Sequence, residues 1–464
     1  MTLVIVATLL LSYLLIATES ITKINKAAIA VFAGTVGWVL YICWGTNFVM
    51  SEHGVAYIDW LDGANPTSIA VKQYIAEDIF LKHIGRVAEI VMFLLATMTI
   101  VEILNNNGCF DPLASWLRTR NSRKLLWTLS FSTFVISANL DNVTTTVMML
   151  VLLHNLVDSH RQRIVYGSAI VIAANAGGAM TVIGEPTGLI LWNMGAVTAS
   201  RFSGTLLLPC LIAWMVPTWW LGRMLPERVT VAEMIEPYRG DDTNLNAWQR
   251  VVMLFVGIGG LWFIPTFHSI TRLSPFLGAL CVLSVLWVVN EIFNRKLMDV
   301  DKMVQRRIPR VLQYGVIQMM LFVTGIMLAI GVVKETGVIE RLAVILDSTF
   351  HNVWLAGIVC GLVSSFFDNF ATAMSFVSFH DLLTDNPSDP FLTAFTQNGH
   401  FWSIIAYSAA LGGSIMSIGS MSGIAFMKME RVKAGWYLKN VSGAALAGWL
   451  LGLLAMYLVS LYAV

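Results

Sequence analysis

Two short polar stretches lie inside otherwise apolar runs of the chain, and each contains an Asp–Asn pair. The first stretch, residues 137–146, lies within the apolar run 125–157 and includes Asp141, Asn142 and several hydroxyl side chains. An ionisable group at membrane depth costs about 2.5 kcal/mol or more, so it normally faces a partner or a cavity. A buried carboxylate among hydroxyls binds a hard alkali cation when it is ionised, and takes up a proton when that cation leaves. These residue types therefore suit the exchange of a cation for a proton.

The pattern occurs twice. Residues 137–146 superpose on residues 364–373 with matching Ser, Asp, Asn and Thr, and the glycine-bounded segment 177–188 superposes on 412–423. Glycines at the start, middle and end of these segments, with Pro186 in the first, predict broken helices. Repeated halves with broken helices are typical of secondary transporters. The candidate ion-binding and proton-carrying residues are Ser137, Asn139, Asp141, Asn142, Thr144, Thr145, Glu185, Thr187, Ser364, Asp368, Asn369, Thr372, Ser417, Ser420 and Ser422.

A sodium ion is predicted at Asp141, Thr145, Glu185 and Asp368. The position equivalent to Glu185 in the second half is Ser420, so the site is expected to be asymmetric, with more negative charge in the first half. Two simpler interpretations compete with this prediction. The aspartates suit helix N-caps, and Glu185 before Pro186 suits a helix start that interacts with the dipole.

Two further glutamates, Glu89 and Glu102, are possible accessory residues. They lie thirteen residues apart in one predicted span, 83–104, and therefore on different faces of a helix. Glu102 lies near the expected cytoplasmic end, where a long side chain reaches the membrane surface. Glu89 lies nearer the middle of the span and is the stronger candidate.

Composition places the chain in a lipid bilayer. Hydrophobic residues make up 57% of the chain, charged residues 12%, and the mean hydropathy is +0.72, whereas soluble domains carry about a quarter charged residues. The net charge of +1 disfavours nucleic acid as a partner. The five cysteines have neither paired nor metal-ligand spacing, so we expect no cofactor beyond the transported ions. The apolar run 2–17 is interpreted as a retained span.

The apolar runs predict an all-α polytopic membrane protein with about ten transmembrane helices. Two further runs are predicted to form re-entrant hairpins, and the whole is arranged as two inverted-topology repeats with broken helices. The expected divisions are a first repeat 1–226 (hairpin 125–157, broken helix 163–197), a linker 227–247 and a second repeat 248–464 (hairpin 352–383, broken helix 399–427).

Orientation follows from Lys and Arg, which collect on the cytoplasmic side. Basic clusters at 118–124 and 161–163 flank a single hydrophobic run, so this run must enter and leave by the cytoplasmic face. The run 352–383 has few basic residues before it and the acidic loop 381–398 after it, so both of its ends are expected outside. The two hairpins therefore enter from opposite sides, and both chain termini are expected to be external.

The stretch 137–146 (Ser-Ala-Asn-Leu-Asp-Asn-Val-Thr-Thr-Thr) closely resembles the signature of NhaD-type sodium/proton antiporters. These belong to a broad ion-transporter superfamily that also holds arsenite exporters and sodium-coupled dicarboxylate carriers. The resemblance continues at 89–102 and 412–430 and covers most of the chain from about residue 80 onward. Members of the family typically carry Gly-Asp-Val-Thr where this chain has Gly184–Glu185–Pro186–Thr187. The glutamate keeps the charge but is one methylene longer, and the proline removes an amide donor.

The resemblance implies exchange of cytoplasmic sodium or lithium for external protons, in a homodimer within the cell's inner membrane. A sodium-coupled carboxylate symporter would need cationic or amide-rich groups near the tips, where no Lys or Arg occurs. An arsenite exporter remains an alternative. A more distant one is an intramembrane aspartyl protease, whose two aspartates share a proton; its usual Gly-x-Gly-Asp context is absent here. A transporter, rather than an enzyme, is therefore expected.

Overall fold

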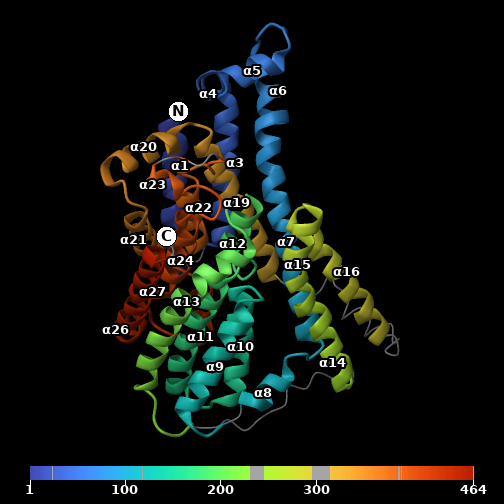
Figure 1. Ribbon diagram of the computed structural model, residues 1–464, viewed down its shortest axis with the longest axis vertical. Helices are drawn as coiled ribbons and strands as arrows, with labels where there is room; N and C mark the ends of the chain where they lie inside the picture. Colours follow the sequence, from blue (N-terminus) through green and yellow to red (C-terminus); the bar gives the residue numbers. More distant parts are fainter. Residues whose placement is uncertain are drawn as a thin grey trace. The chain divides into compact units, whose positions relative to one another are not determined.

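The computed structural model describes residues 1–22, 24–117, 119–229, 245–294, 314–384, 387 and 389–462. The regular elements among them are all helices (Figure 1). Within this part of the chain, eight helical segments are long and apolar enough to cross a membrane, and three further apolar helices are shorter. The prediction of an all-α polytopic membrane protein is thus confirmed. Most of the predicted linker (residues 230–244) and the basic stretch 295–313 lie outside the described residues.

The chain divides into two compact units. The first comprises residues 1–92, 314–352 and 374–381, and the second comprises residues 93–313, 353–373 and 382–464. Helix α7 (Leu81–Asn106) and helix α22 (Asn369–Val377) each run from one unit into the other. The other helices of the first unit are α1 (Thr2–Ala17), α2 (Glu19–Thr22), α3 (Lys26–Cys43), α4 (Gly45–Glu52), α5 (Gly54–Leu61), α6 (Ser68–Tyr74), the π-helix η1 (Ile75–Phe80), α19 (Tyr314–Lys334) and α20 (Val338–Phe350).

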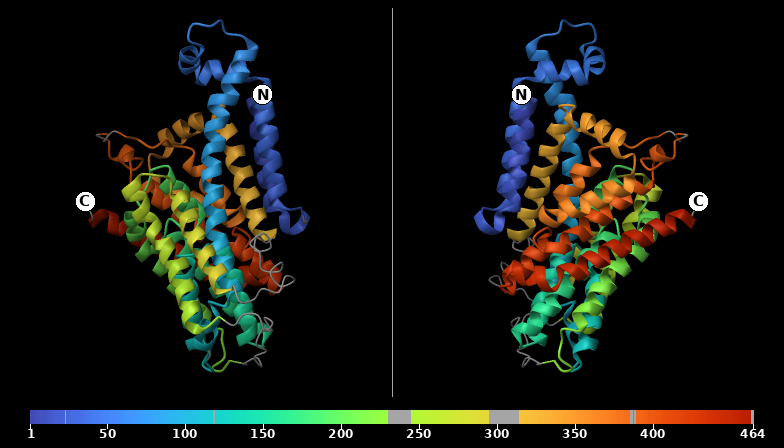
Figure 2. Two further views of the ribbon diagram at one scale, coloured as in Figure 1. Left: turned by 90° about the vertical axis from the view of Figure 1, so that its right-hand side faces the viewer. Right: turned by 90° about the vertical axis from the view of Figure 1, so that its left-hand side faces the viewer.

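The first unit is built on close packing of α3 against α19, with α1 beside both. Figure 2 shows α1 in dark blue next to α19 in yellow-orange. Gly34 and Gly325 lie where α3 and α19 meet, and a Cβ atom at Gly34 would be 2.9 Å from the Gly325 carbonyl oxygen. The Trp38 indole donates to the Leu328 carbonyl over 3.1 Å. Small residues at the contact let membrane helices approach closely, and this pair follows that rule.

The Glu335 carboxylate, whose side chain is 13% exposed, connects three segments of the first unit. Glu335, directly after α19, accepts from His53 Nε2 at 2.6 Å and from His83 Nε2 at 2.7 Å, one on each oxygen. Burial acts to raise the pKa of Glu335, but the hydrogen bonds from His53 and His83 outweigh it and lower that pKa to about 2. The bond to Glu335 raises the pKa of His53, against the opposing effect of burial.

We expect Glu335→Gln to lower the thermal stability of the purified protein, and to do so most strongly in mildly acidic buffer. Because the pKa of Glu335 is lowered, its ionised form stabilises the fold at pH values above the ordinary pKa of 4.5. This contribution is lost as the pH falls towards about 2. Because the pKa of His53 is raised, its protonated form stabilises the fold at pH values below the ordinary pKa of 6.5. This contribution is lost as the pH rises through the raised pKa. The loss should be about 2 kcal/mol near pH 6 and smaller near pH 9.

The measurement is thermal unfolding in detergent at both pH values. Glu340→Gln is a matched control, because Glu340 is an exposed carboxylate in the first turn of α20, a few residues further along the chain. An equal loss at both pH values in Glu335→Gln would contradict the role of the histidines.

The second unit contains the polar stretches and their surroundings. In Figure 1 its helices α9, α10, α11 and α13 run side by side in teal and green. Its helices are α8 (Asp111–Leu117), α9 (Ser122–Ser137), α10 (Asn142–Leu156), α11 (His160–Met180), α12 (Pro186–Asn193), α13 (Ala199–Gly222), α14 (Ala247–Leu254), the π-helix η2 (Phe255–Gly259), α15 (Gly260–Thr271), α16 (Pro275–Phe293), α21 (Val353–Phe366), α23 (Pro390–Thr393), α24 (His400–Met416), α25 (Met421–Met429), α26 (Ala434–Asn440) and α27 (Ser442–Tyr462).

Helices α9 and α10 are joined by a tight turn at residues 138–141 and both pack against α11. Their buried side chains form a core with α11 that includes Leu125, Leu129, Leu153 and Tyr166. The Tyr166 hydroxyl, near the start of α11, donates to the carbonyl of Ser122 at the start of α9 over 3.1 Å. The end of α10 and the starts of α9 and α11 therefore lie at one end of this bundle, as the hairpin interpretation requires.

Candidate ion-binding site

Both glycine-bounded segments interrupt a helix. Helix α11 ends at Met180 and α12 begins at Pro186, whereas α24 ends at Met416 and α25 begins at Met421. The glycine in the middle of each break lies against a hairpin tip. A Cβ atom at Gly184 would be 2.7 Å from the Ser137 carbonyl oxygen, and one at Gly419 would overlap the Ser364 carbonyl oxygen. Only glycine lets the two backbones approach this closely.

The contacts between hairpin and broken helix are repeated in the two halves. The Ser137 hydroxyl donates to the Ala174 carbonyl over 2.6 Å, and the Ser364 hydroxyl donates to the Ala409 carbonyl over the same distance. Ser137 and Ser364 are equivalent positions of the two polar stretches. Ala174 and Ala409 are also equivalent, because each lies three residues before the first glycine of its glycine-bounded segment. Each serine thus fastens the end of a hairpin helix to the helix that breaks beside it.

Glu185 joins the two halves. Its side chain is 5% exposed, and Oε1 accepts from Nδ2 of Asn142 at 3.3 Å and also from Nδ2 of Asn369. These asparagines open α10 and α22, immediately after the aspartates of the two tips. One buried carboxylate is therefore held by an amide from each hairpin, which makes it the centre of the site.

Asn175 is a second junction, and it was not among the residues that the sequence predicted. It is fully buried in α11, where Oδ1 accepts from Asn142 Nδ2 at 3.2 Å. Its own Nδ2 donates to the hydroxyls of Ser414 at 2.8 Å and Ser420 at 3.0 Å. A single amide within the run Ala-Ala-Asn-Ala-Gly-Gly was the available signal, because a buried polar group in such a run needs partners.

The tip aspartates cap helices, as the simpler interpretation predicted, but for Asp141 this uses only one oxygen. Its Oδ1 accepts from the backbone amides of Val143 at 2.8 Å and Thr144 at 3.1 Å. Its Oδ2 is buried and has no hydrogen-bond partner among the described residues. Asp368 is 5% exposed, and its Oδ1 accepts from the amides of Phe370 and Ala371 at 3.1 and 3.2 Å. The cap and a ligand role are therefore compatible in Asp141.

Buried hydroxyls occur in the same helices and breaks. Within the described part of the chain, the hydroxyl oxygens of Thr145, Ser417 and Ser422 are buried without a hydrogen-bond partner. Thr187 and Thr372 are also buried. Ser417 has a left-handed backbone with φ of 62°, directly at the break after α24. Oxygen atoms of carboxylates, amides and hydroxyls are the ligands that hard cations prefer.

Asn139, Glu102 and Glu89 are three further predicted residues. Asn139, at the first hairpin tip, accepts from the Trp262 indole of α15 and donates to the Val135 carbonyl at 2.7 Å. Glu102 is half-buried on the part of α7 that belongs to the second unit. Glu89 is half-buried on the part of α7 that belongs to the first unit, whereas Asp141, Glu185 and Asp368 all belong to the second.

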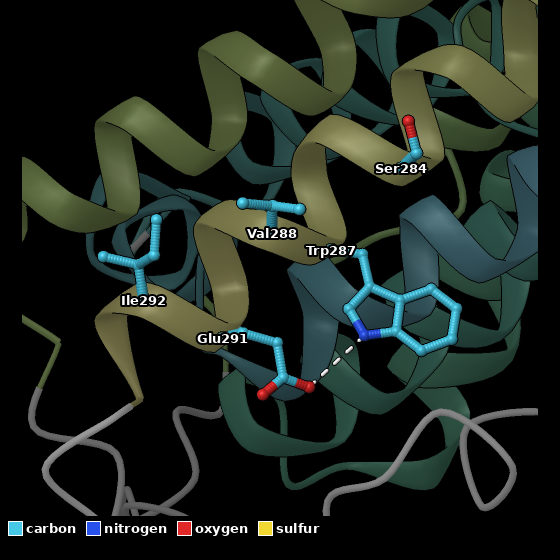
Figure 3. A pocket seen from close by; sticks show the side chains of 5 residues that line it. All are labelled: Ser284, Trp287, Val288, Glu291 and Ile292. Carbon is cyan, nitrogen blue, oxygen red and sulfur yellow. Dashed lines mark hydrogen bonds between the residues drawn. The ribbon is translucent and has the colours of Figure 1, made fainter.

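A shallow pocket opens on α16 and is unrelated to this cluster. It is lined by Ser284, Trp287, Val288, Glu291 and Ile292 (Figure 3). The Trp287 indole donates to the Glu291 carboxylate over 3.3 Å. These side chains lie on one helix, and none of them is a predicted site residue.

Broken helices around buried carboxylates, in a chain whose described part has eight helical segments apolar enough to cross a membrane, are typical of secondary transporters. The chain belongs to the citrate transporter family CitMHS, whose family model matches residues 1–396. It is 32% identical to "Sodium/proton antiporter 2" of Arabidopsis thaliana over 429 residues, which cover 90% of this chain and 96% of that protein. It is 34% identical to "Sodium/proton antiporter 1" of the same plant over 399 residues, which cover 85% of this chain but only 64% of that protein.

A bacterial relative, "Na(+)/H(+) antiporter NhaD" of Vibrio parahaemolyticus, is 28% identical over 370 residues, covering 74% of this chain and 83% of that protein. The predicted resemblance to NhaD-type antiporters is confirmed by these relatives. Because the family and its relatives are transporters, the prediction of a transporter rather than an enzyme is also confirmed, and the protease alternative is dropped.

Proposed function

We propose that this protein exchanges sodium or lithium ions for protons across a membrane. The observation that carries the proposal is Glu185, whose buried carboxylate accepts from Asn142 of one hairpin and Asn369 of the other. A carboxylate in this position can be neutralised either by a cation or by a proton. The sodium/proton antiporters among the relatives support this exchange.

The proposed mechanism is competition for the buried carboxylates. When a cation is bound, its charge compensates Glu185 and Asp141, and the unpaired oxygens of Asp141 and Thr145 are available as ligands. When the cation leaves, an uncompensated charge in a dry site is unfavourable, so a proton binds instead. Replacement of the cation by a proton changes the Glu185 carboxylate, which accepts hydrogen bonds from both Asn142 and Asn369. Both hairpin tips therefore respond to the same exchange.

The two halves differ at the residue that precedes the second helix of each broken pair. The Ser420 hydroxyl caps α25 by accepting from the Gly423 amide at 3.1 Å. Glu185 holds the same position before α12, yet within the described residues its side chain accepts no capping bond. Its carboxylate is used by the tip asparagines instead. This difference supports an ion-binding role for Glu185 over that of a helix-start residue.

Transport of a carboxylate anion is the second candidate, because the family model carries the description of a citrate transporter. An anion site needs cationic or amide-donor groups, and the amides of Asn142 and Asn369 already donate to Glu185. Of the buried side chains that the structure describes, Lys26 is the one base, and it belongs to the first unit, whereas the cluster of the second unit contains Glu185 and Asp368. The charge of the cluster therefore favours a cation.

Proton movement in everted membrane vesicles distinguishes the candidates. Addition of sodium or lithium chloride to respiring vesicles should release the preformed proton gradient, and potassium chloride gives the comparison for cation preference. Radiolabelled citrate uptake, with and without sodium, is the parallel assay. Citrate uptake without cation-driven proton movement would reject the exchanger in favour of the anion transporter.

We further propose two inverted repeats, 1–226 and 248–464, joined by 227–247, with hairpins at 125–157 and 352–383. The repeated serine contacts and the two helix breaks support this division. An inner-membrane location and a homodimer, which the resemblance to NhaD-type antiporters implies, complete the proposal, together with external termini, which follow from the distribution of Lys and Arg.

The hairpin proposal predicts that cysteines at positions 121 and 160 are labelled from the same side of the membrane. Both positions lie at the end of the bundle where Tyr166 contacts Ser122. A cysteine at Gln397 should be labelled from the other side, because α24 and α25 run from that position to the end near residue 160. Cys43 and Cys281 are exposed and should first be replaced by serine. Labelling of 121 and 160 from opposite faces would reject the hairpin.

A further inference from the structure

The first hairpin tip holds one predicted site residue whose partner comes from outside the hairpin. Oδ1 of Asn139 accepts from the indole N–H of Trp262 on α15, and Nδ2 donates to the Val135 carbonyl of α9 over 2.7 Å. Both polar ends of this amide are therefore engaged. Asn139 lies two residues before Asp141, in the tight turn between α9 and α10. A bond that fixes Asn139 consequently restricts the turn that carries the Asp141 carboxylate.

Helix α15 and the residues after it also contact α12, the helix that begins behind Glu185. The Trp192 ring of α12 lies edge-on to His268 of α15, with 5.3 Å between the ring centroids. The Ser274 hydroxyl, just before α16, donates to Asn193 Oδ1 over 3.1 Å. The hairpin tip and the helix behind Glu185 are thus both contacted by the same part of the chain.

Trp262 lies between two irregular places in its own helix. The π-helix η2 ends three residues before it, and Pro265 follows three residues after it. A π-helical turn holds an extra residue and so changes the direction of the side chains that follow, and such turns are frequent at functional sites. Proline removes a hydrogen bond of the helix. A Cβ atom at Gly257 of η2 would be 2.8 Å from the Leu104 side chain of α7, so η2 is closely packed. This irregular but anchored stretch sets the direction of the indole.

The exposure of Trp262 indicates that its ring does not fill the core of the unit. Trp262 is 68% exposed, whereas the packing tryptophans Trp402 and Trp449 are 0% and 1% exposed. In surroundings of low dielectric constant a hydrogen bond is stronger than in water, and its loss costs more. The indole N–H, rather than the ring, is therefore the group that connects α15 to the hairpin tip.

We propose that Trp262 is a positioning residue for the first half of the ion site, because its bond to Asn139 holds the tip in the arrangement in which Asp141 receives a cation. Without this bond the turn is freer, and cation binding must first order it, which lowers the affinity for the cation. The groups that bind the cation are unchanged, so maximal exchange is retained. This inference rests on the proposed exchange function for its effect on transport.

The transport test compares Trp262→Phe with the wild type in everted vesicles over a series of sodium concentrations. Phenylalanine keeps an aromatic ring and removes the N–H donor. Apparent sodium affinity should fall about fivefold, the size expected for one net hydrogen bond, while maximal exchange stays within about twofold of the wild type.

Trp248→Phe is the matched control, because Trp248 is an exposed tryptophan on α14 of the same apolar span, and its sodium affinity should stay unchanged. Unchanged sodium affinity in Trp262→Phe, an equal fall in Trp248→Phe, or a loss of maximal exchange as large as the loss of affinity would overturn the positioning role.

A double-mutant cycle in thermal unfolding of the purified protein tests the contact without any transport assay. Trp262→Phe and Asn139→Ala each remove one side of the same bond, so the double variant should lose less stability than the sum of the two single losses. Trp248→Phe combined with Asn139→Ala should be additive. Additive losses for Trp262→Phe with Asn139→Ala would reject the inference. If the wild type moves no protons with any cation, the proposed function fails, while this measurement still decides whether Trp262 fixes the tip.

Discussion

Glu185→Gln should abolish cation/proton exchange while the protein still folds and inserts into the membrane. Glutamine has the same shape, and its amide oxygen can still accept from Asn142 and Asn369, so the contacts between the hairpins are kept. What is lost is the charge for which the cation and the proton compete. Loss of a direct ligand charge should lower exchange by about 100-fold or more. Sodium-dependent proton movement in vesicles, normalised to protein level, measures this.

Glu185→Asp tests the length of the side chain separately from its charge. The shorter side chain keeps the charge but cannot place its oxygen equally close to both asparagines, so apparent sodium affinity should fall while maximal exchange is retained. Simple competition also requires apparent sodium affinity to decrease as pH falls. Glu291→Gln is the matched control, since Glu291 lies on α16 against Trp287, outside the cluster. A wild-type pH profile in Glu185→Gln would make Glu185 a structural residue.

Much of the fold followed from sequence patterns because membrane helices carry strong signals. Long apolar runs predicted the helices, and clustered glycines predicted the two breaks, where Gly184 and Gly419 let hairpin and broken helix approach. The ends of the breaks, Pro186 and Met421, agree with the glycine-bounded segments. The same glycine pattern occurs in two segments of the chain, which strengthened the prediction of a break in each.

The hydrogen-bond partners of the site residues could not be predicted from the sequence in the same way. Asn175 aligns with Ala410, two positions before the equivalent glycine of the second half, so the repeat gave it no emphasis. Glu185 and Asn369 are 184 residues apart and follow no common motif, so only the fold brings them together. For Asp141, residue type alone allowed either a cap or a ligand, whereas the structure assigns the cap to one oxygen and leaves the other buried.

The second large effect is expected for Asp141→Asn, which should also remove exchange without unfolding the protein. Asparagine caps helices as well as aspartate does, so the bonds from the Val143 and Thr144 amides to the side-chain oxygen can be kept. The negative charge is lost, and the buried second oxygen is replaced by an amide nitrogen that cannot bind a cation. Exchange in vesicles should therefore fall by about 100-fold, with little change in the thermal midpoint.

Asn121→Ala is the matched control, because it should lower stability and leave exchange in place. Asn121 caps α9 of the same hairpin by accepting from the Lys124 amide at 3.0 Å, far from the tip. Its loss should lower stability by about 1 kcal/mol and leave exchange in place. If Asp141→Asn kept sodium-driven proton movement at normal protein levels, Asp141 would be a cap alone. The proton would then have to be carried by Glu185 with Asp368, which directly precedes Asn369 at the second tip.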